Sequence, residues 1–192
     1  TPLFHTLAQR IMFISLINGA TLYISDFSPL NLINIIKDKK INFTMMVSVQ
    51  IKRIFLLPKI KKNYFKSIKC LVSSSESIEP EIKRKIVEKF NINLHEIYGL
   101  SEGGTLTNLD VKKNLKKIKS VGKAVDQTKI KIINKKNGIG EIIFKSPRIY
   151  YRFLGERLIS NKKNYFNTGD IGYLDNDNFL YYSGRKKEII RF

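Results

Sequence analysis

Residues 94–104 read LHEIYGLSEGG, a short apolar run that ends in a polar, glycine-rich turn. Open α/β sheets bind ligands at the carboxyl ends of their strands, and this turn stands at such an end. Its glycines let a ligand approach the backbone closely. The hydroxyl of Ser101 suits a phosphate oxygen, and the carboxylate of Glu102 offers a hard oxygen to a magnesium ion that bridges phosphates. The stretch therefore predicts a phosphate-binding turn in an α/β protein.

The residues around this turn alternate between two kinds of pattern. From Leu7 to about Leu109, apolar runs with helical spacing alternate with short β-branched runs. This order indicates crossover units and predicts a mostly parallel sheet with flanking helices. The helices are expected at residues 7–17, 29–39, 49–57 and 81–90, and the strands at residues 21–24, 42–47, 68–72 and 94–99.

The pattern changes after a lysine-rich connector, VKKNLKKIKS, which we interpret as a solvated loop. Beyond it, β-branched runs are joined by Asn, Asp and Gly turns such as KKNGIG and DNDN. Strands connected in this way are typical of hairpins in an antiparallel sheet or a small distorted barrel. We therefore divide the chain into an α/β part at 1–110, a basic connector at 111–119 and a β-rich subdomain at 120–185.

The composition of the chain bears on whether it binds nucleic acid or spans a membrane. The formal net charge of the 192 residues is +19, but the lysines are scattered through every segment together with Ile and Asn. No nucleic-acid module accompanies the charge, so we expect no nucleic-acid partner. No apolar run reaches the roughly 18 residues of a membrane span, which predicts no transmembrane segment and leaves a peripheral membrane contact open. The lone Cys70 is typical of a reducing, cytoplasmic compartment.

Three further polar stretches follow apolar runs. The turn at 74–76 has the same form as the first one, since it follows the expected strand IKCLV. The stretch NTGD at 167–170 is interpreted as a tight turn that carries a carboxylate, Asp170, which suits hydroxyl groups. The stretch SGRKK at 183–187 carries the guanidinium fork of Arg185, which suits an anion.

These stretches belong to a series of short motifs that runs nearly from end to end of the chain. The series is Pro2-Leu3-Phe4-His5, Val47-Ser48-Val49, Ser74-Ser75-Glu76, Tyr98-Gly99-Leu100-Ser101-Glu102, Ser120-Val121-Gly122-Lys123-Ala124, Gly140-Glu141-Ile142, Thr168-Gly169-Asp170 and Gly184-Arg185-Lys186-Lys187. In identity, order and spacing these motifs resemble those of the adenylate-forming superfamily. That superfamily comprises acyl-CoA synthetases, the adenylation domains of peptide synthetases, and luciferases.

The resemblance implies ATP, Mg²⁺ and coenzyme A as the cofactor and co-substrates. It implies that Asp170 accepts hydrogen bonds from both ribose hydroxyls and that Arg185 donates to the nucleotide near the ribose and phosphate. Lys187 falls at the hinge of the family, so residues 186–192 are expected to begin the link to a C-terminal domain that the chain lacks.

The other roles that the resemblance implies concern the phosphates, the base and the acid. Ser101 would contact the phosphates, Glu102 the magnesium ion, and Tyr98 would stack near the adenine. His5 would lie near the carboxylate of the acid. The expected catalytic groups are His5, Ser101, Glu102 and Arg185, and the expected nucleotide-binding groups are Ser74, Ser75, Glu76, Tyr98, Gly99, Ser101, Asp170 and Arg185.

The chain departs from the family pattern at several positions. Ser74 and Ser75 stand where the family has glycines, Ser48 replaces a proline, and Ala124 with Asp126 replaces a proline-rich pair. The phosphate loop that precedes the PLFH-like segment in the family, and the C-terminal domain with its catalytic lysine, are absent from the chain. We therefore expect a fragment of a large N-terminal domain that ends at the hinge and is inactive alone.

The function that the resemblance implies is ATP-dependent activation of a carboxylic acid, fatty or aryl, to an acyl-adenylate and transfer to coenzyme A, as part of a larger enzyme. The YGLSE, PLFH and GRKKEII stretches favour acyl-CoA synthetases over amino-acid-activating domains. Two alternatives remain open. One is an adenylation domain that loads a carrier protein, and the other is a non-catalytic nucleotide-binding remnant.

Overall fold

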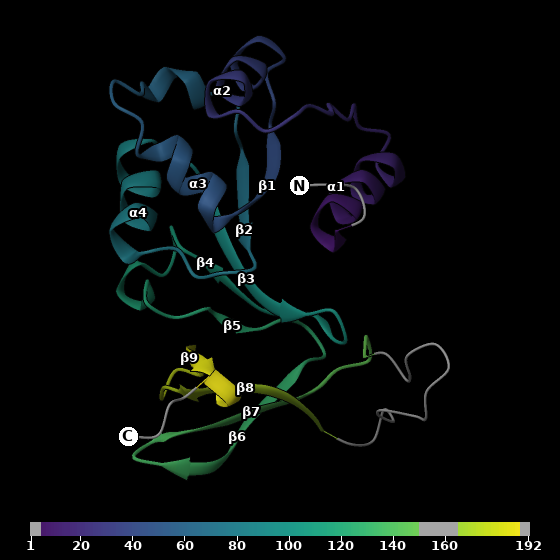
Figure 1. The fold of residues 1–192 in the computed structure, drawn as a ribbon, viewed down its shortest axis with the longest axis vertical. Coiled ribbons are helices and arrows are strands. Elements are labelled where there is room, and N and C mark those ends of the chain that lie inside the picture. Colours follow the sequence, from purple (N-terminus) through teal and green to yellow (C-terminus); the bar gives the residue numbers. More distant parts are fainter. Residues whose placement is uncertain (1–4, 150–164, 189–192) are drawn as a thin grey trace. The chain divides into compact units, whose positions relative to one another are not determined.

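The computed structural model of the protein describes residues 5–149 and 165–188 (Figure 1). Its helices and helical turns are α1 (Thr6–Ile17), α2 (Pro29–Asp38), α3 (Ser48–Phe55), η1 (Lys62–Phe65), α4 (Pro80–Arg84), η2 (Lys85–Lys89), η3 (Leu115–Lys117) and η4 (Lys186–Glu188). Its strands are β1 (Phe43–Val47), β2 (Cys70–Ser74), β3 (Leu94–Leu100), β4 (Gly104–Asp110), β5 (Lys123–Ala124), β6 (Lys129–Lys136), β7 (Ile139–Lys145), β8 (Phe166–Leu174) and β9 (Leu180–Arg185). Two parts of the predicted motifs, Pro2–Phe4 and residues 189–192 of the hinge, lie outside the described residues.

The first sheet has the strand order β1-β2-β3-β4-β5. Strands β1, β2 and β3 run parallel, with Thr44 opposite Leu71 and Leu71 opposite Leu94, whereas β5 runs antiparallel to β4. Helices α3 and α4 lie beside β1 to β3 on the side opposite to α1 (Figure 1). The predicted α/β fold with flanking helices is therefore confirmed, with a mixed sheet.

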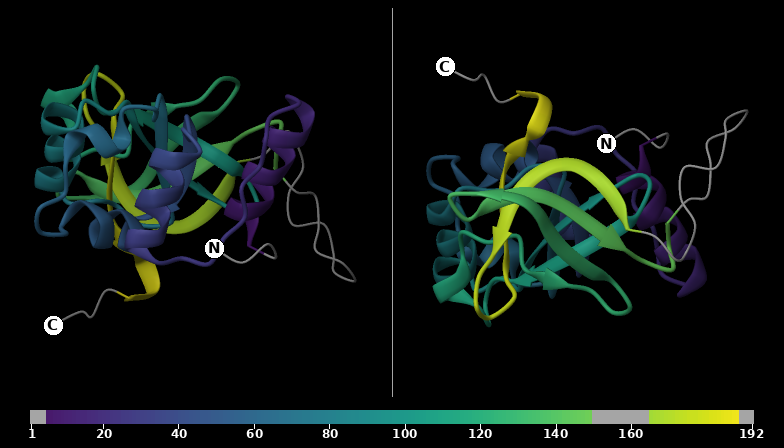
Figure 2. Two further views of the ribbon diagram at one scale, coloured as in Figure 1. Left: turned by 90° about the horizontal axis from the view of Figure 1, so that it is seen from above. Right: turned by 90° about the horizontal axis from the view of Figure 1, so that it is seen from below.

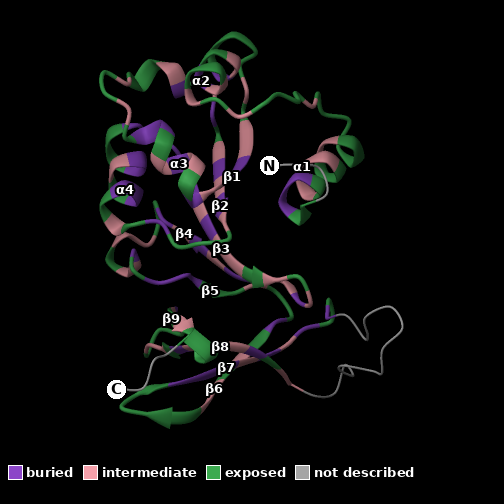
Figure 3. Cartoon of the chain, in the orientation of Figure 1, coloured by how far each residue is buried: buried purple, intermediate pink, exposed green. Residues whose placement is uncertain are grey.

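Helices pack against a sheet through apolar residues that recur at helical spacing, and α3 is the example here. In α3, Ile51, Ile54 and Phe55 lie on one face and are buried, as the purple segments of Figure 3 show. The ring of Phe55 stacks at 5.0 Å on Phe65, and Phe90 meets both rings edge-on. Burying such rings contributes about 1.5–3 kcal/mol each, so this cluster fixes α3 and the end of η2 in the first core.

The chain forms two compact units, and each is described here by itself. The first unit runs to Glu96 and includes Asp110–Ile118, and the second contains Ile97–Leu109 and continues from Lys119. The lysine-rich connector is more than a solvated loop, because Val111 and Ile118 are buried and the amide of Val111 donates to the carbonyl of Leu94 at 3.0 Å. These two buried apolar residues attach the connector to the first unit.

One expected strand is wrong. Residues 21–24 form no helix or strand, and Tyr23 and Ile24 expose 45% and 73% of their surface. A β-branched run becomes a strand only where a neighbouring strand supplies its hydrogen bonds. In the described sheet, β1 is the edge strand and pairs with β2 alone.

The second sheet is antiparallel, with the strand order β6-β7-β8-β9. It confirms the predicted hairpins, and its strong curvature is clear in the right-hand view of Figure 2, where β8 arches over β6 and β7. Ile142 of β7 packs in one buried cluster with Leu180 of β9, and Phe144 of β7 packs in another with Leu106 of β4. Among the described residues, no helix has the length and apolar content needed to cross a lipid bilayer.

Candidate functional site

The acidic and the basic stretch near the end of the chain lie on neighbouring strands. Residues 168–170 were expected in a tight turn, and this is wrong, because they lie within β8, where Gly169 has a φ of 74° and kinks the strand. Arg185 ends β9, so antiparallel pairing sets it directly opposite Asp170. The two charges are therefore close because they form a cross-strand pair.

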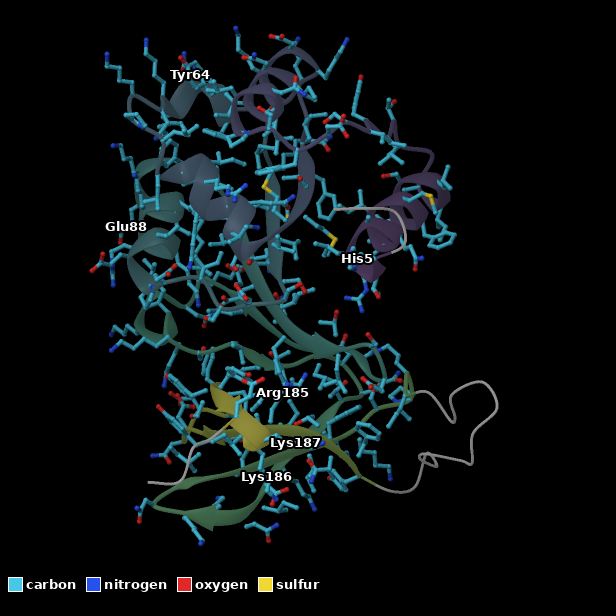
Figure 4. The ribbon with its side chains drawn as sticks, in the orientation of Figure 1. His5, Tyr64, Glu88, Arg185, Lys186 and Lys187 are labelled. Carbon is cyan, nitrogen blue, oxygen red and sulfur yellow. The ribbon has the colours of Figure 1, made fainter. Side chains whose placement is uncertain are left out.

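The guanidinium of Arg185 bridges the carboxylate and the backbone of β8. Its Nε lies 3.1 Å from Oδ1 of Asp170, and its Nη1 donates to the carbonyl of Thr168 at 3.1 Å. The carboxylate is only 5% exposed, whereas the Arg185 side chain is 51% exposed. Figure 4 shows Arg185 with Lys186 and Lys187 at the end of β9. One side of the cation remains open to solvent.

The two oxygens of Asp170 differ in their partners. Tyr98 donates its hydroxyl to Oδ2 at 2.6 Å. Oδ1 is buried and accepts no hydrogen bond from a described residue, although Nε of Arg185 lies 3.1 Å away. Burial, together with the hydrogen bond to Asp170, raises the pKa of Tyr98 far above its usual range, so its hydroxyl stays a donor at neutral pH. Asp170 thus has one satisfied oxygen and one acceptor without a donor.

Two hydrogen bonds hold the backbone of Asp170 in place. Its amide donates to Oγ1 of Thr168 at 3.0 Å, and the Thr168 hydroxyl donates to the carbonyl of Ile142 at 2.8 Å. The ring of Tyr182 lies 5.9 Å from that of Tyr98 and is tilted by 42° against it. Burial and the charge of Asp170 raise the pKa of Tyr182 as well.

The predicted phosphate-binding turn lies between β3 and β4. Ser101 is exposed and Glu102 is half-buried, and neither forms a hydrogen bond or ion pair with any other residue in 5–149 or 165–188. Gly99 is needed for packing, since a Cβ there would collide with the carbonyl oxygen of Gly104. The glycine that was expected to admit a ligand thus lets the two strands approach each other.

A magnesium ion fits what this turn offers. Within the described part of the chain, no group of three or more His, Cys, Asp or Glu side chains could enclose a metal. Magnesium, however, commonly takes one or two carboxylates and fills its remaining positions with phosphate oxygens and water. A single unpartnered carboxylate, Glu102, matches that pattern.

The turn at 74–76 belongs to the first unit and follows β2. Ser75 has a φ of 83°, in the left-handed region that favours glycine, which explains why a glycine suits this position. Glu76 accepts a hydrogen bond from the hydroxyl of Ser48 at 2.9 Å, and Ser48 begins α3. The turn is therefore tied to the start of that helix.

Two other predicted residues lie on the surface. His5 is exposed and directly precedes α1, and its carbonyl accepts the amide of Gln9 at 3.1 Å. Lys187 is exposed in η4. Of the predicted site residues, the structure thus joins Tyr98, Asp170 and Arg185 through direct contacts, and the roles of all the predicted site residues stay predictions.

Glu141 lies near the Asp170–Arg185 pair, and the sequence analysis assigned no role to it. Glu141 of β7 accepts hydrogen bonds from Asn134, Asn167 and Lys186. It is part of the Gly140-Glu141-Ile142 motif, so its motif was recognised but its partners were not. Those partners come from three other segments, and no spacing rule in the sequence predicts that they meet.

The comparison with family models decides the family. The model described as AMP-binding enzyme matches residues 1–152, which is more than half of the chain. The chain belongs to the AMP-binding enzyme family. The predicted resemblance to adenylate-forming enzymes is therefore confirmed.

Several named proteins of this family resemble the chain in sequence. A 2-succinylbenzoate–CoA ligase of Oceanobacillus iheyensis is 30% identical over 98% of this chain and 41% of its own length. The 4-coumarate–CoA ligase 4 of Arabidopsis thaliana is 26% identical over the whole chain and 36% of its own length. The chain thus spans about two fifths of the length of the curated relatives it matches.

Solved structures show the same fold. The O-succinylbenzoate coenzyme A synthetase of Bacillus subtilis, solved in complex with ATP and a magnesium ion, superposes with a TM-score of 0.86 over 99% of this chain and 41% of that chain, at 23% identity. The N-terminal domain of FACL13 from Mycobacterium tuberculosis superposes with a TM-score of 0.80 over 96% of this chain and 49% of that one, at 22% identity. At these identities the likeness establishes the fold.

Proposed function

We propose that this chain supplies the ribose- and phosphate-binding part of an enzyme that uses ATP to convert a carboxylic acid to an acyl-adenylate and then transfers the acyl group to coenzyme A. The observation that carries the proposal is the buried Oδ1 of Asp170, which accepts no hydrogen bond from any described residue. Its cationic neighbour is the guanidinium of Arg185, whose Nε lies 3.1 Å away without donating a hydrogen bond to it. A vicinal diol such as that of ribose brings the missing donors.

The groups next to Asp170 favour a ligand in which a phosphate is attached to the ribose. Arg185 keeps half of its side chain in solvent beside Asp170, where it can donate to the nucleotide near the ribose and α-phosphate. Tyr98 holds Asp170 through its hydroxyl and offers its ring to the adenine. Ser101 would bind the phosphates and Glu102 the magnesium ion, which supplies charge neutralisation when bound.

The acid and the remaining roles are also part of the proposal. Relatives named 2-succinylbenzoate–CoA ligase from Oceanobacillus iheyensis and Lactococcus lactis favour an aryl acid over a fatty acid. The Ser74–Glu76 turn would contact the edge of the adenine, and His5 the carboxylate of the acid. ATP and coenzyme A are supplied in the cytoplasm, so we place the enzyme there.

A non-catalytic nucleotide-binding protein is the second candidate, and Ser75 favours it. This residue holds a φ of 83°, which costs a residue with a Cβ about 1–2 kcal/mol relative to glycine. A binding remnant under weak selection would tolerate that strain at the adenine turn. Nucleotide binding is common to both candidates, and turnover separates them.

The test is pyrophosphate release by the whole protein that contains residues 1–192, with Mg-ATP and one acid at a time. The panel holds 2-succinylbenzoate, 4-coumarate, a long-chain fatty acid and several amino acids, followed by coenzyme A or a carrier protein as acceptor. We expect release with an aryl acid and formation of its coenzyme A thioester. A folded protein that binds AMP but releases no pyrophosphate with any acid is the remnant, and release with amino acids alone indicates carrier loading.

A further inference from the structure

Glu141 lies where three other segments of the second unit meet. Its carboxylate is nearly buried, with 11% of the side chain exposed, and it accepts three hydrogen bonds. Oε1 accepts from Nδ2 of Asn134 at 2.9 Å and from Nζ of Lys186 at 2.6 Å, and Oε2 accepts from Nδ2 of Asn167 at 2.9 Å. Both oxygens are therefore occupied by the protein itself, unlike those of Asp170.

Two of these partners adjoin the Asp170–Arg185 pair in sequence. The side-chain oxygen of Asn167 accepts the amide of Gly169 at 2.9 Å, so the Asn167 amide group links Glu141 to the kinked backbone that carries Asp170. Lys186 directly follows Arg185 and begins η4. One carboxylate thus holds the strand segments of both members of the pair.

The local backbone explains why this support is needed. Pairing between β7 and β8 is irregular between Glu141 and Ile143, and pairing between β8 and β9 is irregular between Ile171 and Gly172. Regular ladder hydrogen bonds are interrupted at such bulges, so side chains have to fix the local geometry there. The hydrogen bond from Asn167 to Glu141 crosses the first irregularity, and Asn167 and Lys186 both lie on the Asp170 side of the second.

We propose that Glu141 is a positioning residue that sets the separation of Asp170 and Arg185 by clamping Asn167 and Lys186 at the same time. This inference rests on the proposed binding of ribose by Asp170. Glu141 does not touch the nucleotide in this account. Its removal loosens the backbone on both sides of the pair, and the unpaired Oδ1 of Asp170 no longer meets the two hydroxyls of a bound ribose together.

The experiment measures two affinities of the full chain, for AMP and for 2′,3′-dideoxy-AMP. The key variant is Glu141→Gln, which keeps the size of the side chain and removes its charge, and the matched control is Lys135→Met, which removes an exposed charge elsewhere on the same sheet. We expect Glu141→Gln to weaken AMP binding about tenfold, at the lower end of what losing an outer partner costs a metal ligand. Binding of dideoxy-AMP should weaken less, because it lacks the two hydroxyls and can lose only the contact with Arg185, so that the preference for AMP shrinks.

A merely structural role predicts a different result, because general destabilisation weakens both ligands equally and leaves the preference for AMP unchanged. That outcome overturns the inference. Asn167→Ala provides a second variant: Glu141→Gln should have a much smaller effect in the Asn167→Ala background than in the original chain, and full additivity contradicts the clamp.

Amide hydrogen exchange separates failure of the inference from failure of the proposed function. If the unmodified chain does not prefer AMP over dideoxy-AMP, the ribose role of Asp170 is wrong. Even then, Glu141→Gln should accelerate exchange of the Gly169 amide and of the amides in 185–188, while Lys135→Met should not. Unchanged exchange in Glu141→Gln rejects the clamp whatever the nucleotide does.

Discussion

Each unit contains a buried carboxylate next to a cation, and the two pairs are built differently. In the first unit, Glu96 binds Lys83, and both side chains are almost completely buried. Glu96 also accepts the amide of Ile78 at 2.8 Å. In the second unit, Asp170 is equally buried, but Arg185 is half-exposed and one oxygen of Asp170 has no donor.

A structural charge pair and a binding group can be distinguished by whether the partners in the protein enclose both charges. Lys83 also donates to the carbonyl of Ile118 at 2.9 Å, so the first pair is closed on every side by α4, β3 and the segment that ends the connector. A closed pair can only hold the fold together. In Asp170, by contrast, Oδ1 accepts no hydrogen bond from the described residues, and the neighbouring cation is accessible to solvent. A ligand with hydroxyl groups can supply the donor.

The largest expected effect comes from opening the closed pair. Lys83→Met leaves Glu96 buried without its cation, and breaking a buried pair in this way costs about 3–5 kcal/mol. Urea denaturation of the chain measures the loss. The control is Lys52→Met, which breaks the more exposed Lys52–Glu79 pair and should cost about 1 kcal/mol or less. If the two variants lose equal stability, the contrast between closed and open pairs is wrong.

The same variant should acquire a dependence on pH. Burial raises the pKa of Glu96 above its usual value, and Lys83 opposes that rise. A carboxyl with a raised pKa in the folded state holds its proton there while the unfolded chain has lost it, so stability falls as pH rises through that interval. We expect Lys83→Met to lose more stability near pH 8 than near pH 5, measured by thermal unfolding. A loss that is constant with pH contradicts this reason.

Glu141 gives the opposite dependence on pH. Hydrogen bonds from Lys186, Asn134 and Asn167 lower the pKa of Glu141 to about 2. A lowered pKa contributes stability that is present above the value of the unfolded chain, about 4.5, and is lost as pH falls towards 2. The melting temperature should therefore fall less steeply between pH 4.5 and 2 in Glu141→Gln than in the unmodified chain. Parallel curves would show that the clamp does not contribute to folding.

The smallest effect concerns Ser75, whose backbone adopts a glycine-like conformation. Ser75→Gly removes the strain of a left-handed residue but adds freedom to the unfolded chain, so we expect a net gain of about 0.5–1 kcal/mol. The matched control, Ser74→Gly, lies in the extended end of β2 and should lose stability. Denaturation curves of the two variants measure their free energies of unfolding. A loss of stability in both variants would mean that the backbone of Ser75 is not strained.

Periodicity was enough to predict the elements of the first unit but not their ends. Apolar spacing located α1 to α4 and the parallel strands β1 to β3, and in α2, α3 and α4 one buried face accounts for the pattern. The run at 21–24 failed because strand propensity says nothing about whether a partner strand is present. The local sequence therefore predicts a helix better than a strand, because a strand also needs a neighbouring strand that the local sequence does not show.

The site was predictable as residues but not as contacts. Asp170 was predicted to suit hydroxyl groups and Arg185 an anion, yet their pairing with each other depends on the register of β8 and β9 and on a bulge after Ile171. The support from Glu141 and the closed pair of Lys83 and Glu96 join residues far apart in the chain. Such contacts follow from the folded backbone, and no local pattern encodes them.

The most direct test of the central claim is the preference of the chain for AMP over 2′,3′-dideoxy-AMP, measured by titration calorimetry before and after Asp170→Ala. We expect the unmodified chain to bind AMP roughly 30- to 900-fold more tightly than 2′,3′-dideoxy-AMP, which corresponds to about 2–4 kcal/mol for two charge-assisted hydrogen bonds. In Asp170→Ala the two ligands should bind with equal, weak affinity. A chain that binds AMP but keeps its full preference after Asp170→Ala would contradict the claim that Asp170 holds the ribose.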